Sequence, residues 1–480
     1  ELPELQSPGY IEISFRSEGV EPVGMDYLAL SEIFLQPIQK NWTLGKGNPE
    51  PDVILFTISS TSASQLGSYG QDIARTPFLD KLARSGYSHT DVTSVSNGSK
   101  EDVWSIASGQ YPRDHGVFRT NINHKESLKV LPEILSSTNY QPHGIVHSPA
   151  SSFEIFTKIN GFRRLYLSNA QKSGLASLQE SLNDLLTSPY LRRKPAYMWL
   201  HLDPGLTRDD ELGFFPVDKY SDEVLPISKL NLPQSEQQRL LKLSKGSEKD
   251  PDLRRILACN DMRVYELDKQ IESICANLMR KRKQRSLIVV VTTDHGVIRF
   301  SDSNTLSADS LSQEVLHTPL IITRLEKSRN QKSSGSSQLY DFPATSLKLF
   351  DTVVGLIRSG DLAGVPQELK TSTASSSSVN SFFAEHSFRP IVAYRKGSDK
   401  LIHCLSDPYF QIATTNLYNL EVDPSETINK VGRDPSGTRQ LLGPVMAFCR
   451  GSDFYPDPRP GLEDEALELL KSLNYTETVE

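Results

Sequence analysis

The sequence predicts an α/β fold built on a large, mostly parallel central sheet that helices flank. Two patterns support this prediction: short, continuous apolar runs typical of buried parallel strands, and helical patterns that alternate with them. The chain length gives a third indication: 480 residues are too many for one small hydrophobic core and suit a large domain with a smaller one. In such sheets, functional sites lie at the carboxyl ends of the strands.

The first half of the chain begins this alternation. Val53–Ile58 is a continuous apolar run and predicts a central strand. Thr76 and Pro77 predict the N-cap and the first residue of a helix, and Gly86 predicts its end. The other elements expected here are a helix over 102–108 that ends at Gly109, and strands over 144–147 and 197–202.

The second half opens with a polar, loop-rich stretch over 205–255. A long amphipathic helix follows around Val264–Leu278, where apolar residues recur at steps of three and four. The basic run at 280–283 predicts a solvated helix end that the helix dipole favours. The next strand is expected over 287–291.

Serine-rich stretches and a change of pattern indicate the domain organisation. After the serine-rich residues 371–381, short strands over 390–394 and 401–404 and a helix near 464–473 predict a small C-terminal α+β subdomain. We therefore expect an N-terminal extension over 1–50, an α/β domain over 51–370, a serine-rich loop over 371–383 and the C-terminal subdomain over 384–480.

Charge and composition restrict the partners. The net charge of −7 argues against nucleic acid, since phosphate-binding proteins usually carry a basic excess. No apolar run reaches the roughly 18 residues that span a bilayer, so no transmembrane segment is expected. The chain begins at Glu1, which removal of an export signal would explain, so a periplasmic or extracellular location is one expectation. The four cysteines lack CxxC spacing and are either free thiols or one or two disulfides.

Several segments, in order along the chain, resemble the sulfatase family of the alkaline phosphatase superfamily. They include the strand that starts at Pro51-Asp52 and the Asp294-His295-Gly296 sequence after the strand over 287–291. The others are 66–70, Thr76–Gly86, Ser108–Pro112, Asp114–Val117, His317–Ile322 and Leu417–Thr427. The resemblance implies a large α/β domain of the alkaline phosphatase type with a small C-terminal subdomain.

The resemblance also implies a particular chemistry. Sulfatases hold a divalent cation, usually calcium, largely by carboxylates, because a hard cation prefers charged oxygen ligands. The cation offsets charge that develops on the ester oxygens. Their nucleophile is a formylglycine hydrate made from Cys or Ser in a C/S-x-P-x-R motif, and lysine and histidine side chains bind the sulfate.

This sequence departs from that pattern at most of the chemical positions. Where the family has aspartate ligands after the first strand, this chain has Ser59 and Ser60, whose hydroxyls carry no negative charge. The nucleophile position falls on Ser99, but the motif's proline and arginine are replaced by Glu101 and Val103. We therefore do not expect Ser99 to be converted to formylglycine.

The groups that would bind the sulfate are also altered. The family's Asp-Pro-His is Asp203-Pro204-Gly205 here, and a lysine position aligns near Asp309. A second lysine position lies near His147. Near Asp309, a lysine that would bind an anion is thus replaced by a negative charge.

Asp294 and His295 match the family's last pair of metal ligands, and we interpret them as a remnant of the metal site. No cofactor is expected beyond a residual divalent metal. That metal is either weakly bound calcium or zinc held by this pair with His147, His201 or His317. His115 is expected to be structural. In a rebuilt site, Glu101 and Asp102 would replace the lost carboxylates, although Asp102 also suits a helix start near the positive end of the dipole.

Three functions remain open from the sequence. The leading hypothesis is a pseudoenzyme, a sulfatase fold kept for binding an unknown protein partner or an anionic ligand. The second is an active sulfate or phosphate ester hydrolase with a remodelled metal site and Ser99 as a direct nucleophile. The third is a structural subunit of a larger assembly. The candidate catalytic residues are Ser99, His147 and His201, and the candidate metal ligands are Asp294 and His295.

Overall fold

The computed structural model describes fourteen stretches of the chain, all within one compact unit that extends from Lys40 to the C-terminus. The stretches are 50–70, 76–118, 124, 127–148, 152–188, 191, 194–203, 251–282, 285–296, 311–326, 338–370, 381–387, 390–405 and 414–450. For 169–176 and 251–262 only the backbone is described. Residues 1–49, residues 205–250 of the expected loop-rich stretch, the core of the serine-rich loop at 371–380 and the expected helix at 464–473 lie outside these stretches. Residues 251–255, expected in a loop-rich stretch, are helical.

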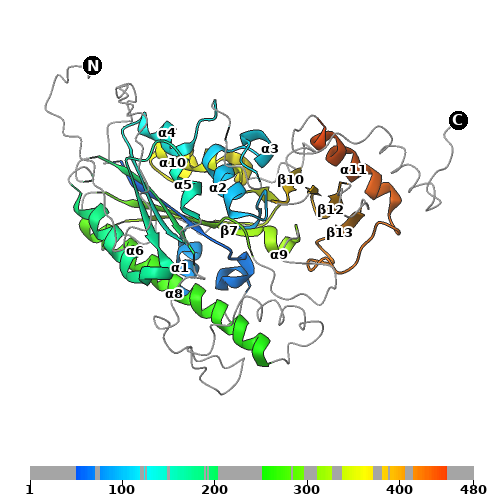
Figure 1. Cartoon of the computed structure of the whole chain (residues 1–480), viewed down its shortest axis with the longest axis horizontal. Coiled ribbons are helices and arrows are strands. Elements are labelled where there is room, and N and C mark those ends of the chain that lie inside the picture. The colour runs from blue at the N-terminus through cyan, green and yellow to red at the C-terminus, as the bar shows by residue number, and fades with distance from the viewer. Residues whose placement is uncertain are drawn as a thin grey trace, which may run out of the picture. The chain divides into compact units, whose positions relative to one another are not determined.

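A large mixed sheet forms the centre of the described part (Figure 1). Its strands, nine among the described residues, follow the order β4-β3-β5-β1-β6-β7-β2-β8, with β9 also paired to β2. They are β1 (Asp52–Ile58), β2 (Tyr87–Thr93), β3 (Gln141–Ser148), β4 (Arg164–Asn169), β5 (Ala196–Leu202), β6 (Leu287–Thr293), β7 (His317–Leu325), β8 (Gln338–Tyr340) and β9 (Ala344–Thr345). Only β7 runs antiparallel to its neighbours, β6 and β2, so the expected mostly parallel sheet is confirmed.

A second, antiparallel sheet contains the C-terminal strands. Its order is β10-β11-β12-β13, and its strands are β10 (Ser381–Glu385), β11 (Ile391–Lys396), β12 (Asp399–Cys404) and β13 (Thr414–Asn419). Val445 and Leu441 of helix α11 (Pro435–Cys449) pack on this sheet with Leu401 and Leu417. The sequence prediction of two strands here was right, but α11 was not predicted. The exact domain boundaries proposed from sequence stay predictions.

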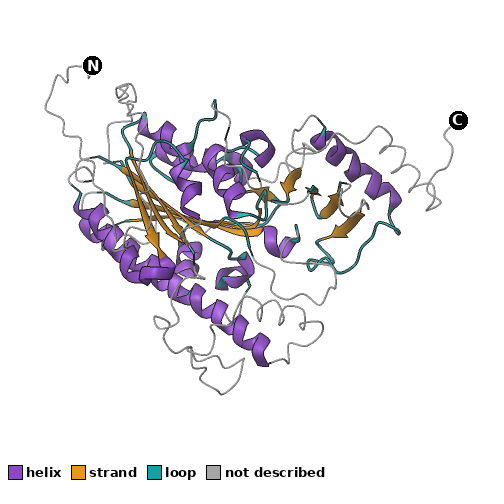
Figure 2. Cartoon of the chain, in the orientation of Figure 1, coloured by secondary structure: helices purple, strands orange, loops and turns teal. Residues whose placement is uncertain are grey.

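Helices cover both faces of the large sheet (Figure 2). Val53 and Leu55 of β1 face a core that includes helices α2, α4, α5 and α10, whereas Ile54, Phe56 and Ile58 face α1, α6 and α8. The ranges are α1 (Pro77–Ser85), α2 (Ser99–Ser108), α4 (Leu131–Ser136), α5 (Phe153–Thr157), α6 (Ala170–Thr187), α8 (Pro251–Lys281) and α10 (Lys348–Ser359). The described part also contains the short helices α3 (Pro112–His115) and α9 (Gln313–Leu316). Burial on both faces explains why β1 is a continuous apolar run.

Two expectations about helices differ from the structure. Helix α2 begins at Ser99, three residues before the expected start at Asp102, and ends as expected at Gly109, whose φ of 70° suits glycine. The basic run after α8 is not wholly solvated, because Arg282 is buried. Its guanidinium donates to both carboxylate oxygens of Asp52, at 2.7 and 2.6 Å, and to the carbonyl of Lys194. The prediction of a solvated terminus is wrong for this residue because a buried carboxylate lies within its reach.

Two further findings concern the whole described part. Among the helices that the structure describes, none is both long and apolar enough to cross a membrane. Cys275 and Cys449 are free thiols, and the side chain of Cys259 lies in the stretch where only backbone is described. The alternative of free cysteines therefore holds for Cys275 and Cys449.

Candidate functional site at the ends of β1 and β6

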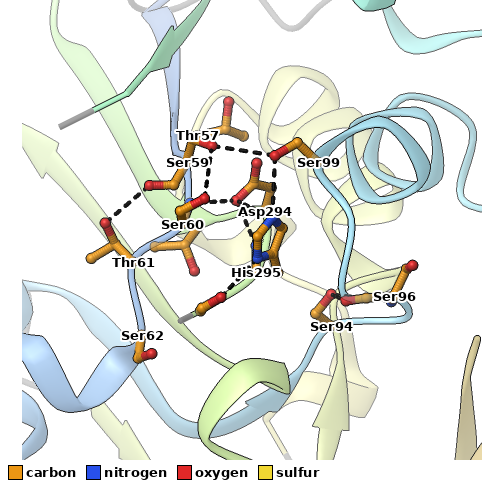
Figure 3. A network of polar contacts seen from close by, with 12 residues as sticks. Thr57, Ser59, Ser60, Thr61, Ser62, Ser94, Ser96, Ser99, Asp294 and His295 are labelled. Carbon is orange, nitrogen blue, oxygen red and sulfur yellow. Dashed lines mark hydrogen bonds and ion pairs between the residues drawn. The ribbon is translucent and has the colours of Figure 1, made fainter. Parts of the chain in front are cut away.

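The candidate site lies where two neighbouring parallel strands end beside the start of a helix. Ile58 of β1 is in register with Thr293 of β6, so the residues that follow both strands meet at one edge of the sheet. These are Ser59 and Ser60 after β1, and Asp294 and His295 after β6 (Figure 3). Ser99, the first residue of α2, faces them. The structure thus brings together three predicted site residues, Ser99, Asp294 and His295.

Asp294 is fully buried, and its two carboxylate oxygens differ. Oδ1 accepts hydrogen bonds from the backbone N–H of Ser60 at 3.0 Å and of His295 at 2.6 Å. Oδ2 is buried and has no hydrogen-bond partner among the described residues. Figure 3 shows the carboxylate directed toward the hydroxyls of Ser59 and Ser99. One oxygen therefore organises the backbone, and the other is the acceptor still available for a ligand.

A chain of hydroxyl groups runs from β1 to His295. Ser59 Oγ lies 3.4 Å from Ser60 Oγ and 3.3 Å from Ser99 Oγ, and Ser99 Oγ lies 3.2 Å from His295 Nε2. His295 Nδ1 lies 2.7 Å from the carbonyl oxygen of Gly296, which can only accept. Nδ1 therefore donates, and in the neutral ring Nε2 is the acceptor. Consequently the Ser99 hydroxyl donates to His295.

Local backbone geometry holds these side chains in place. Ser60 adopts the left-handed conformation with φ of 51°, which costs a non-glycine residue roughly 1–3 kcal/mol. Its N–H bond to Asp294 opposes this strain. Gly296 packs closely against α9, since a Cβ there would lie 2.6 Å from the carbonyl oxygen of Glu314 and 2.3 Å from Ser62 Oγ. Only glycine permits this approach, which explains the sequence Asp294-His295-Gly296.

Comparison with known proteins identifies the family. A family model described as sulfatase matches residues 51–352 of the chain. The chain belongs to the sulfatase family. A comparison with curated protein sequences found no match.

Solved structures of sulfatases and a related hydrolase share the fold of this sulfatase-family chain. One is BT4656, solved with its substrate D-glucosamine-2-N,6-O-disulfate (16% identity, TM-score 0.60, covering 85% of this chain and 100% of that one). Another is the phosphonate monoester hydrolase of Agrobacterium radiobacter (15% identity, TM-score 0.59, covering 90% of this chain and 98% of that one). A third is BT1596, a 2-O GAG sulfatase (16% identity, TM-score 0.57, covering 90% of this chain and 95% of that one). At such low identity these similarities show the fold alone.

The side chains present do not fit the divalent cation that the family implies. In the part of the chain that the structure describes, no three His, Cys, Asp or Glu side chains gather as a metal site. The positions after β1 offer only the Ser59 and Ser60 hydroxyls, and Asp294 Oδ1 already accepts from two N–H groups. A hard cation such as calcium prefers six to eight oxygen ligands with several carboxylates. The donor set is thus short of charge.

The predicted histidines lie apart from this hydroxyl chain. His201 is buried on β5, and its Nδ1 lies 3.0 Å from Thr57 Oγ1. Burial lowers the pKa of His201, and the nearby Asp294 charge partly opposes this. His147 is buried at the end of β3 with Nδ1 2.8 Å from Ser168 Oγ, and burial lowers its pKa to about 4. His201 therefore lies beside β1, next to Thr57 and near the site, while His147 has a separate partner.

Two further histidines named from sequence have other partners, and Asp102 is buried in the first turn of α2. His317 Nε2 lies 2.6 Å from the carbonyl oxygen of Thr90. His115 accepts from the N–H of Val117 and contacts Ser105 Oγ, at 3.0 and 3.1 Å, within the core beside α2. Asp102 is buried, and burial raises its pKa well above the usual value, with smaller contributions from the Asp294 and Glu101 charges. Gly205 and Asp309 lie outside the described residues.

Sequence reasoning missed two residues that shape the site. Thr57 Oγ1 accepts from Trp199 Nε1 at 2.9 Å and contacts His201, and a polar residue inside the apolar run 53–58 was the available signal. Gly296 supplies the carbonyl that sets the His295 tautomer. Its glycine identity was visible in sequence, but the close approach of α9 was not.

Proposed function

We propose that this sulfatase-family protein does not hydrolyse sulfate esters by the metal and formylglycine chemistry of the family, and that its fold is kept for binding. The observation that carries the proposal is the hydroxyl chain Ser60–Ser59–Ser99 at the positions of lost metal ligands and nucleophile. Neutral hydroxyls bonded to one another supply no negative charge for a hard cation, and they are not the formylglycine hydrate that serves as the family's nucleophile. The fold-defining segments persist while the chemical positions have changed.

The electrostatics of the site favour a protein partner over an anionic ligand. Asp294, Asp102 and Glu101 are buried near the start of α2, where a bound sulfate would sit in the family. The related BT4656 binds a disulfated glucosamine, but here the charges of Asp294 and Glu101 would oppose such an anion. We expect any anionic ligand to bind weakly at this point, and the periplasmic or extracellular location remains a prediction.

Metal content of the purified, undialysed protein is the first test. We expect elemental mass spectrometry to find calcium and zinc well below one equivalent, and added calcium or zinc not to restore it. One equivalent of either ion, lost when both Asp294 and His295 are replaced, would refute the proposal. Activity is the second test: aryl sulfate hydrolysis should not exceed that of the Ser99→Ala variant.

A second candidate is a hydrolase of sulfate or phosphate esters that uses Ser99 directly. The observation that favours it is the hydrogen bond from Ser99 to His295 Nε2, with the ring oriented by Gly296. Ser99 Oγ would attack the sulfur or phosphorus, His295 would take its proton, the alcohol would leave, and water would then release the anion from Ser99. This reaction needs a metal beside Ser99, which Asp294 would help to hold, so Asp294→Asn should remove both metal and turnover, whereas His295→Asn should remove turnover by removing the base. Turnover that persists in both variants would exclude this candidate.

The third possibility, a subunit of a larger assembly, differs from the first only in the type of partner. Native mass spectrometry of the protein isolated from its source separates the two. A stable complex of fixed composition would indicate a structural subunit, whereas a lone monomer would count against it.

A further inference from the structure

The C-terminal segment Leu417–Thr427, a family-like motif far from the site in sequence, completes strand β13 and then forms a tight turn. Asp423 accepts hydrogen bonds from the N–H and hydroxyl of Thr427, at 3.1 and 2.9 Å, and from the N–H of Ile428 at 2.8 Å. Within this turn Glu426 adopts the left-handed conformation, with φ of 56°. The turn thereby directs Glu426 inward, and only 1% of its side chain is exposed.

The Glu426 carboxylate has one partner on each oxygen. Oε1 lies 2.8 Å from Nζ of Lys400 on β12, whose side chain is also 1% exposed. Oε2 accepts from the backbone N–H of Gln313, the first residue of α9, at 2.5 Å. A buried charge pair of this kind is costly to break, because removing one partner leaves the other charged and desolvated. Glu426 thus connects the C-terminal sheet to α9.

Helix α9 in turn holds the segments that follow both site strands. The Val315 carbonyl accepts from the N–H of Gly296 at 2.6 Å, and the Glu314 carbonyl accepts from Ser62 Oγ at 2.9 Å. Gly296 follows His295 directly, and its carbonyl accepts from His295 Nδ1. A displacement of α9 therefore moves the group that orients the His295 ring.

We infer that Glu426 is a positioning residue for the site: through Gln313 and α9 it sets the orientation of His295 relative to Ser99. Lys400 supplies the charge that keeps the Glu426 carboxylate buried. The inference concerns the same site as the proposed function, but it requires neither turnover nor a bound ligand. Its test therefore reads the His295 ring itself, so finding metal or activity would refute the proposed function without affecting this result.

The experiment is NMR of histidine-labelled protein, with the His295 ring signals assigned by a His295→Asn variant. Gln313→Pro removes the donor to Glu426 and displaces the Glu426 carboxylate from α9, because the ring carbon takes the place of the amide hydrogen, while Lys400 and Glu426 both stay charged. The first helical position tolerates proline, and Ser312 before it has φ −65° and ψ 157°, which suit a residue that precedes proline. A second test is the double variant Lys400→Met with Glu426→Leu, which lacks both charges and the acceptor for the Gln313 N–H. Its matched control is Lys400→Met with Glu426→Gln, which also lacks both charges but keeps that acceptor.

The expected result is a shift of the His295 ring signals in Gln313→Pro and in the Met/Leu double variant, with signals near wild type in the Met/Gln variant. His403, on β12 with Nδ1 2.9 Å from Thr415 Oγ1, reports disturbance of the C-terminal sheet itself. A merely structural ion pair would move His403 in both double variants and leave His295 unchanged in all three proteins. That outcome would overturn the inference. If the Met/Leu variant does not fold, Gln313→Pro decides alone, since it breaks the Glu426–Gln313 contact and keeps both charged residues, with His403 reporting any wider disturbance.

Discussion

Individual buried charges in this protein have specific partners that lie far away in sequence. Asp52 begins β1 and accepts from Arg282, just after α8, and from the N–H of Ala196 at 2.9 Å. Both side chains are below 10% exposed. Burial makes the pair sensitive to the loss of either member, because the remaining charge cannot regain its hydration.

We expect Arg282→Met to lower the free energy of unfolding by about 3–5 kcal/mol, since it leaves Asp52 buried and unpaired. Urea unfolding followed by circular dichroism measures this. Lys281→Met is the control, because Lys281 is exposed, and its effect should stay within about 0.5 kcal/mol. A similar loss in both variants would show that the pair contributes nothing specific.

The buried histidine His147 should make stability depend on pH. Its pKa is about 4 when folded and about 6.5 when unfolded. Between these values the unfolded chain binds a proton that the folded protein does not, so stability falls as pH falls through this window. His147→Leu removes this term. We expect the difference in free energy of unfolding between wild type and this variant to shrink by about 1 kcal/mol as pH falls from about 7.5 to about 5.5. Ser168→Ala retains the ring, and its deficit should change less over the same range.

At the scale of elements, helix α1 depends on another helix for its N-terminal cap. Thr76 occupies the predicted N-cap position, but its side chain makes no capping bond to α1. Instead, Asp268 of α8 accepts from the N–H groups of Phe78 and Leu79, at 3.1 and 2.8 Å. Burial raises the pKa of Asp268 to about 6, although both N–H groups act to lower it. Sequence rules for caps identify the position, but here the acceptor comes from elsewhere.

Removing that acceptor should destabilise the protein at the α1–α8 contact. We expect Asp268→Ala to cost roughly 1–3 kcal/mol, because two buried N–H groups lose their partner. Asp268→Asn keeps one acceptor oxygen and should cost less. The measurement is equilibrium unfolding, with hydrogen exchange at Phe78 and Leu79 as a local check. Equal costs for the two variants would contradict a capping role.

At the scale of the whole molecule, buried polar contacts join the two sheets. Arg395 of β11 donates to both carboxylate oxygens of Asp91 on β2, at 2.6 and 2.5 Å. The N–H of Glu385, at the end of β10, donates to the carbonyl of Val95 at 2.8 Å, in the segment that leads to Ser99. The N–H of Ser387 donates to Asn97 Oδ1, also at 2.8 Å. The C-terminal sheet is therefore part of the structure that shapes the candidate site.

Thermal stability should not depend on divalent cations. A ligand that binds only the folded state at about 100 times its Kd adds about 2.7 kcal/mol of stability. Because we propose no such cation site, we expect Tm in about 1 mM calcium chloride to match Tm in EDTA within about 1 °C. Differential scanning calorimetry measures this, with magnesium as the control for ionic strength. A clear rise with calcium that Asp294→Asn abolishes would contradict the expectation.

The sequence by itself determined the fold class and the central strands, and it indicated which residues lie together in the candidate site. β1 and β6 are recognisable because strands buried on both faces are apolar throughout, a local property of the chain. Parallel strands end at the same edge of a sheet, so Ser59, Ser60, Asp294 and His295 could be expected to lie together. Ser99 followed from the order of the family-like segments.

Only the tertiary structure decided which groups pair and which do not. The Ser99–His295 hydrogen bond, the capping by Asp268, the Asp52–Arg282 pair and the Glu426–Gln313 contact join residues 113 to 230 positions apart. No local pattern encodes such a choice, because each polar side chain could bond to many partners and burial selects one. For the same reason His147 and His201, both plausible ligands in sequence, bond instead to Ser168 and Thr57.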